Sequence, residues 1–131
     1  MRKLLKRFAI SSAELYKRRF FWIMNAVAVL ALGFSLGYLY FMLFPQIVEQ
    51  GYVPLHYNIH FGVDSFGDWR WIFLAPGVSL AFIIVNNVIA GMVAKKDYVL
   101  SYIAITVSTV CSLLCLLAII HIIQLNLNYY G

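Results

Sequence analysis

The chain has 131 residues, of which 63% are hydrophobic and 11% are charged, and its formal net charge is +5. Soluble domains carry about 25% charged residues and less than about 50% apolar residues, so the composition excludes an ordinary soluble domain, a disordered segment and a disulfide-rich secreted mini-protein. The basic residues gather at positions 2–19 and 95–96, with Arg70 alone, which is typical of membrane orientation and excludes a nucleic-acid-binding surface.

At this length the sequence predicts a single membrane domain over residues 1–131. Its first part, residues 1–19, is predicted to form an amphipathic helix on the membrane surface. One helical face collects apolar and small side chains, while most of the basic residues lie elsewhere. Such a helix would bind membrane lipid through anionic headgroups. The alternative is a solvated orientation signal with no helix on the surface.

Three apolar segments are long enough to span a bilayer, which takes about 20 residues of helix. They cover residues 20–44, 71–93 and 98–125, and none contains Lys, Arg, Asp or Glu. Pro45 is expected to end the first span, because proline cannot continue a helix without losing a hydrogen bond. The first apolar run is longer than that of a cleavable signal peptide, so it is expected to remain as a signal anchor.

The basic residues also predict the orientation of the chain. With the N-terminus in the cytoplasm, nine of the ten lie inside and only Arg70 lies outside. We therefore expect an integral protein of the cytoplasmic (inner) membrane. Residues 45–70 and the C-terminus are then extracytoplasmic.

Small and polar residues within the spans are candidates for helix packing, because helices in lipid associate through close backbone contact and polar bonds. These candidates are Gly33, Gly37, Asn86, Asn87, Ala104, Ser108 and Ser112. The two neighbouring asparagines are expected to bind the second helix to another helix. The small-residue faces are predicted to close a three-helix bundle within one chain. A homo-oligomer, or docking on a larger protein partner, is the alternative.

The 26-residue connection at residues 45–70 is long enough to have structure of its own. From Val53 to Phe61 apolar and polar residues alternate, which predicts a half-buried extended segment. Its apolar side, which begins at Val53, would rest on the helix ends, and its other side would carry Pro54, His56, Asn58 and His60. Residues 62–67, with glycine at both ends, are predicted to form a turn.

A metal site in this connection is the competing interpretation. His56, His60, Asp64 and Asp68 recur every four residues. In an extended strand such neighbours lie about 13 Å apart, which is too far for two imidazoles to share one ion. We therefore predict neither a metal nor a cofactor, and we expect a hydrogen-bonded structural role for the histidines.

The string Pro54-Leu55-His56-Tyr57-Asn58, followed by Gly62, Asp64 and Gly67, resembles a bacterial family of small membrane proteins of unknown function. The same domain occurs at the N-terminus of membrane proteins similar to the immunity factor against a sporulation-delaying toxin. The resemblance implies that the loop motif, structural or binding, consists of Pro54, His56, Asn58, Gly62 and Asp64. It implies no reaction.

The fold expected from the sequence is an all-α membrane protein: three transmembrane helices, an N-terminal interfacial helix and a structured extracytoplasmic loop. No catalytic residues are predicted, because the sequence offers no recognisable nucleophile-and-base set. The expected function is that of a non-enzymatic accessory or interaction subunit. The alternative is a sensor or immunity-type protein that binds a peptide or small ligand at the outer loop.

Overall fold

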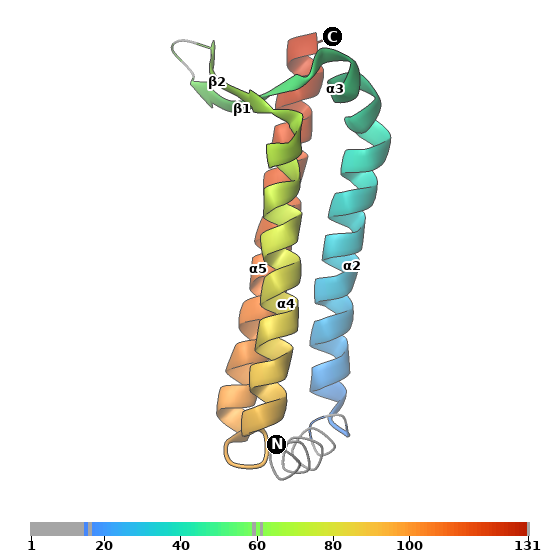
Figure 1. Cartoon of the computed structure of the whole chain (residues 1–131). Helices are drawn as coiled ribbons and strands as arrows, with labels where there is room; N and C mark the ends of the chain where they lie inside the picture. The colour runs from blue at the N-terminus through green and yellow to red at the C-terminus, as the bar shows by residue number, and fades with distance from the viewer. Residues whose placement is uncertain (1–14, 16, 59, 61, 131) are drawn as a thin grey trace, which may run out of the picture.

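The computed structural model describes residue 15, residues 17–58, residue 60 and residues 62–130, so the expected surface helix over residues 1–19 lies largely outside the described residues. Three long helices dominate the described chain: α2 (Arg19–Met42), α4 (Leu74–Val93) and α5 (Tyr98–Tyr130). Figure 1 shows them side by side. All three are long and apolar enough to cross a membrane, which confirms the prediction of three such helices.

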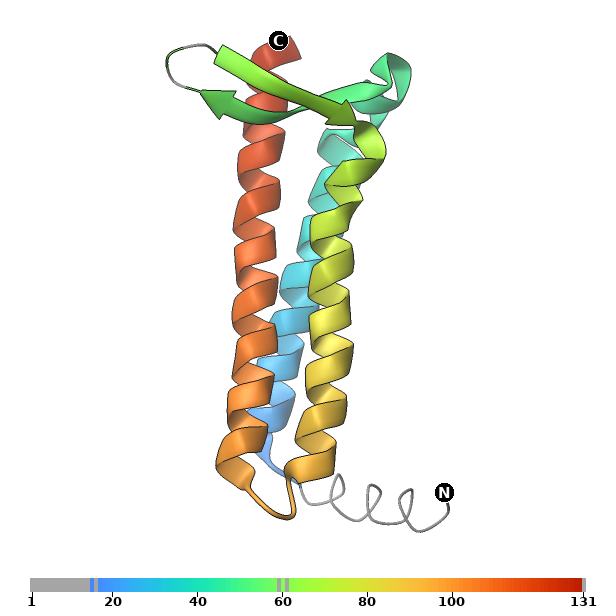
Figure 2. The ribbon, with the colours of Figure 1, turned by 60° about the vertical axis from the view of Figure 1, so that its left-hand side comes forward.

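Helix α5 is the central member of the bundle. It packs against both α2 and α4 over much of their length, whereas α2 and α4 make few contacts with each other. At 33 residues it is also the longest helix, with a length of about 50 Å at about 1.5 Å per residue. Figure 2 shows that it continues past the start of α4 to the level of the strands.

Large apolar side chains cover the outside of the bundle. Leu30 and Phe41 of α2 are 71% and 76% exposed, and α4 and α5 carry further exposed valines, isoleucines and leucines. A soluble monomer rarely exposes large contiguous apolar patches, whereas lipid tails are as apolar as these side chains. The surface therefore suits a bundle that sits in a membrane.

The first span ends differently from the prediction. Helix α2 stops at Met42, and a second helix, α3 (Phe44–Gln50), starts almost at once with Pro45 in its first turn. Proline is well tolerated there because the first amides of a helix have no partner within it, so Pro45 begins a helix rather than ending one. Helix α3 ends at Gly51, whose φ of 76° allows its amide to donate to the carbonyl of Ile47.

The chain is mostly helical, as expected, but the long connection contains a β-hairpin, whose first strand lies where the extended segment was predicted from Val53. Strand β1 (Tyr52–Asn58) pairs antiparallel with β2 (Gly62–Asp68), and a short 3-10 helix, η1 (Trp69–Phe73), leads into α4. The expected turn at residues 62–67 is instead most of β2. Gly62 has the positive φ of 76° that a turn residue needs, but it lies where β2 begins, paired with Asn58 of β1.

The turn between α4 and α5 lies at the opposite end of the bundle from the hairpin (Figure 1). Asp97 caps α5, because its Oδ1 accepts from the amides of Val99 and Leu100 at 2.8 and 3.1 Å. One turn later, the Ser101 hydroxyl donates to the carbonyl of Ala90 in α4. This bond fixes the start of α5 against the end of α4.

Candidate functional site: a hairpin held on the bundle

The hairpin β1–β2 lies across one end of the bundle, roughly perpendicular to the helices (Figure 2). Val53 of β1 is fully buried. It belongs to an apolar cluster built from α2, α3, η1 and α5, namely Leu39, Leu43, Ile47, Val53, Ile72, Cys115, Ile119 and Ile123. The prediction that Val53 rests on the helix ends agrees with this position.

Pro54 is buried, like Val53, although the predicted alternation places the two on opposite sides of the strand. The pairing register is irregular between Pro54 and His56, so the strands do not keep a strict two-residue period there. This irregularity begins after Pro54, because Val53 and Pro54 themselves pair in regular register with Gly67 and Phe66.

Asn126 in α5 binds the hairpin directly. Its Nδ2 donates to the carbonyl of Pro54 at 3.1 Å and to the carbonyl of Ile122, in its own helix, at 2.8 Å. The side chain is fully buried, and among the described residues nothing bonds its Oδ1. The bond to Pro54 is therefore a buried polar link between β1 and α5.

The five predicted motif positions are distributed along the two strands. Pro54 lies in the contact with α5, and His56 is exposed, with its backbone opposite Ser65. Asn58 of β1 and Gly62 of β2 face each other at the distal end of the hairpin, and Asp64 lies further along β2. Within the described residues, no group of three or more His, Cys, Asp or Glu could hold a metal ion. The role of His56 in the shape of the loop remains a prediction.

Aromatic rings surround the base of the hairpin. Phe44 contacts Tyr40 at 5.4 Å and Trp69 at 5.8 Å between ring centroids, and the Arg70 guanidinium lies 5.8 Å from the Trp69 centroid. Aromatic side chains favour the boundary between membrane and water, where one edge can stay wet. The ring cluster therefore suits the level at which the bundle leaves the lipid.

A second pair of rings lies on the hairpin itself. Tyr52 and Phe66 contact each other edge to face at 5.7 Å, and each is 48% exposed. Tyr52 neighbours the buried Val53 in the strand, and successive side chains in a strand point to opposite faces. The aromatic pair therefore lies on the face turned away from the apolar cluster.

The predicted packing residues of α5 lie inside the bundle. Ser108 and Ser112 are fully buried, and Ala104 is half-buried. Ser112 is the link to α4, since its hydroxyl accepts from that of Ser79 at 3.0 Å. These residues face neighbouring helices of the same chain, as the bundle prediction requires.

The two asparagines of α4 behave differently from each other. Asn87 Nδ2 donates to Asn25 Oδ1 in α2 at 2.7 Å, which bridges the two helices that otherwise touch little. Asn86 is half-buried, and no described group bonds its Nδ2. Only Asn87 therefore makes the polar link expected of this pair.

Gly33 and Gly37 lie outside the packed interfaces. A Cβ atom added at either position would meet nothing within 4 Å. Both glycines line an open apolar groove of about 810 Å³ on α2, together with other α2 residues such as Phe34 and Phe41. The expectation that this glycine face closes the bundle within one chain is wrong, because the packed face of α2 carries Ala28, Leu32 and Ser35 instead.

Sequence reasoning missed Asn126 as a functional residue. The available signal was an asparagine close behind the third apolar run, where a buried amide needs partners. The sequence could not identify the partner, because a backbone carbonyl carries no residue-specific signal.

Comparison of the chain with protein-family models, curated proteins and solved structures gave no match. The resemblance of the hairpin motif to a membrane-protein family remains a prediction. The functional argument therefore depends on the described geometry.

Proposed function

We propose that this chain is a small non-enzymatic integral membrane protein that acts as an accessory or interaction subunit. In this proposal the hairpin end faces the extracytoplasmic side of the cytoplasmic membrane. The orientation is supported by the basic residues, because nine of the ten fall in the two sequence segments that would then be cytoplasmic, positions 2–19 and 95–96. Three helices able to cross a membrane support an integral location.

The observation that carries the proposal is the fixation of the hairpin by two different contacts. Val53 is enclosed in the apolar cluster, and Asn126 binds the Pro54 carbonyl. A surface that is ordered before binding loses less conformational entropy when a partner docks. The hairpin is thus suited to present side chains in a fixed arrangement.

The exposed pair Tyr52 and Phe66 supplies suitable contact chemistry on this surface. Aromatic residues are enriched at protein interfaces and often contribute most of their binding energy. The partner is therefore expected to be a membrane protein, or an extracytoplasmic protein, with an apolar recess. A second copy of the chain is the alternative partner.

Photo-cross-linking in native membranes tests this proposal. A photoreactive phenylalanine analogue at Phe66 should give one protein adduct in near-stoichiometric yield, which mass spectrometry would identify. The same analogue at Ile84, an exposed α4 residue on the apolar surface of the bundle, is the matched control and should give lipid adducts. The adduct mass distinguishes another protein from a second copy.

Absence of a protein adduct at Phe66 in native membranes would contradict the subunit proposal. The sensor or immunity-type alternative gives a different result. A peptide or small ligand would then slow hydrogen exchange in β1 and β2 of the purified protein, with no protein partner present.

A further inference from the structure

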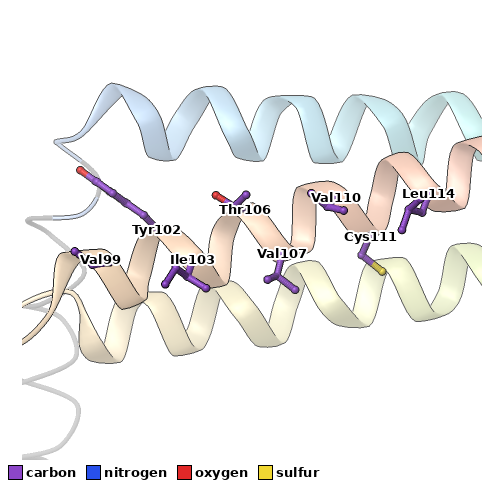
Figure 3. A pocket seen from close by; sticks show the side chains of 8 residues that line it. All are labelled: Val99, Tyr102, Ile103, Thr106, Val107, Val110, Cys111 and Leu114. Carbon is purple, nitrogen blue, oxygen red and sulfur yellow. The ribbon is translucent and has the colours of Figure 1, made fainter.

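A second apolar groove runs along α5 and starts at the basic end of the bundle. It has a volume of about 530 Å³ and extends from Val99 and Tyr102 to Leu114. That volume lies within the range of roughly 300–1,000 Å³ that is typical of small-molecule sites. Figure 3 shows its lining as a stripe of side chains on one helix, with Tyr102 reaching toward the start of α2.

Basic residues from two separate segments lie at the end of the bundle where this groove starts. One segment is the start of α2, with Lys17, Arg18 and Arg19. The other is the turn before α5, with Lys95 and Lys96, and all five side chains are exposed. Of the described residues at this end, only Asp97 is acidic, and its carboxylate caps α5. The described residues at this end therefore carry a net positive charge.

Aromatic contacts connect these basic residues to the groove. The Arg18 guanidinium lies 4.9 Å from the Tyr98 ring centroid, and the Phe20 ring lies 4.6 Å from that of Tyr102, which lines the groove. Arg18 is also the N-cap residue of α2, and its side chain makes no capping bond there. The positive end of the α2 dipole adds to the charge at this point.

The chemistry of the groove changes in a definite order along α5. Cationic groups lie at the end of the bundle where the groove starts. The hydroxyl-bearing residues Tyr102 and Thr106 come next, and apolar residues such as Val107 and Val110 then line the groove. A phospholipid presents the same order, with a phosphate, then glycerol esters, then acyl chains. From Tyr102 to Leu114 the helix rises about 18 Å. One leaflet has a hydrocarbon depth of about 15 Å, half of about 30 Å, so the lengths also match.

We infer that this groove is a binding site for one anionic phospholipid, whose headgroup meets the basic residues and whose acyl chain lies along α5. A zwitterionic lipid would fill the groove equally well but would lack the net negative charge. This inference is independent of the function proposed for the hairpin, because the two sites lie at opposite ends of the bundle (Figure 1).

Native mass spectrometry of the full chain in mild detergent tests the inference. The probes are phosphatidylglycerol and phosphatidylcholine with identical acyl chains, and the wild type should retain the anionic lipid preferentially. The double variant Arg18→Gln/Arg19→Gln should reduce this preference about thirtyfold, because each basic residue near a lipid surface contributes about 1 kcal/mol. Arg70→Gln, which removes a cation at the hairpin end, is the control and should leave the preference unchanged.

The groove is tested by filling it. Val107→Trp should lower retention of phosphatidylglycerol about tenfold, whereas Ile84→Trp on α4, which is exposed to a similar extent, should not. If Val107→Trp does not fold, Val110→Phe fills the same groove. An excess of inorganic phosphate should not displace the lipid.

Three results would overturn the inference. The first is equal retention of the two lipids by the wild type. The second is a preference that persists without Arg18 and Arg19. The third is binding that is sensitive to these arginines but insensitive to groove filling or displaced by phosphate, which would identify a surface contact of the headgroup or a free-anion site.

Discussion

Replacement of Asn126 should lower the local stability of the hairpin without unfolding the helix bundle. In Asn126→Leu the Pro54 carbonyl loses the donor that lies 3.1 Å away, and an unsatisfied buried carbonyl costs about 1–3 kcal/mol. The same change also removes the buried Oδ1 that no described residue bonds, which offsets part of this cost. The net loss of local stability is therefore expected near the lower limit, at about 1 kcal/mol.

Hydrogen exchange measured by mass spectrometry is the appropriate assay. A loss of about 1 kcal/mol corresponds to about fivefold faster exchange in β1 and β2, with little change in α4. Asn126→Asp should have the larger effect, because an ionised carboxylate cannot donate to either carbonyl and its charge would be buried. Asn128→Leu, which alters an exposed residue of the same helix, is the matched control.

Two outcomes would refute this reasoning. Unchanged exchange of the hairpin in both Asn126 variants would mean that the bond to Pro54 does not hold the strands. Equal acceleration in the hairpin and in α4 would mean that Asn126 stabilises the whole bundle rather than the attachment of the loop.

Further predictions concern the helices and the topology. Asn25→Leu and Asn87→Leu, combined in a double-mutant cycle and measured by unfolding in mixed micelles, should give a coupling free energy of about 0.6–1.7 kcal/mol. A coupling free energy near zero would contradict the hydrogen bond between α2 and α4. Ile119 is fully buried in the apolar cluster, so Ile119→Ala should reduce the free energy of unfolding by about 2–5 kcal/mol. Leu117 is 53% exposed, so Leu117→Ala should reduce it by less than about 1 kcal/mol. Equal effects of the two substitutions would contradict the assigned packing. In a variant without Cys111 and Cys115, a cysteine at Glu49 should react with an impermeant thiol reagent outside intact cells and one at Asp97 should not, and the reverse pattern would invert the proposed orientation.

The three spans were predictable because a membrane imposes a simple requirement on the sequence. About 20 uncharged apolar residues suffice, whatever the helix packs against, and the structure has three such helices. The interhelical role of Asn87 was also predictable, since a buried amide in lipid needs a partner. Its particular partner, Asn25, was not, because the pairing depends on how two distant segments are rotated.

The errors share one physical cause: the sequence pattern does not reveal which part of the structure a residue faces. Gly33 and Gly37 have the spacing of a packing motif, but the rotation of α2 turns them outward. A proline ends a helix when it lies inside it but is favourable in the first turn of a helix. Pro45 is in a first turn because the helix before it breaks at Leu43, which the sequence does not reveal. Pro54 is buried although the alternation places it on the side opposite to Val53, and the alternating pattern could not reveal what covers that side.

The position of α5 between the other two helices has a consequence for biogenesis. Synthesis proceeds from the N-terminus, so α2 enters the bilayer before its main packing partner, about 80 residues further along, has been made. Two of its polar side chains form hydrogen bonds within α2 itself. Asn25 Nδ2 donates to the carbonyl of Phe21, and the Ser35 hydroxyl donates to that of Ala31, both one turn back in the same helix. The donors of Asn25 and Ser35 are therefore satisfied within a newly inserted α2, whereas Asn25 Oδ1 still lacks the bond that Asn87 later supplies.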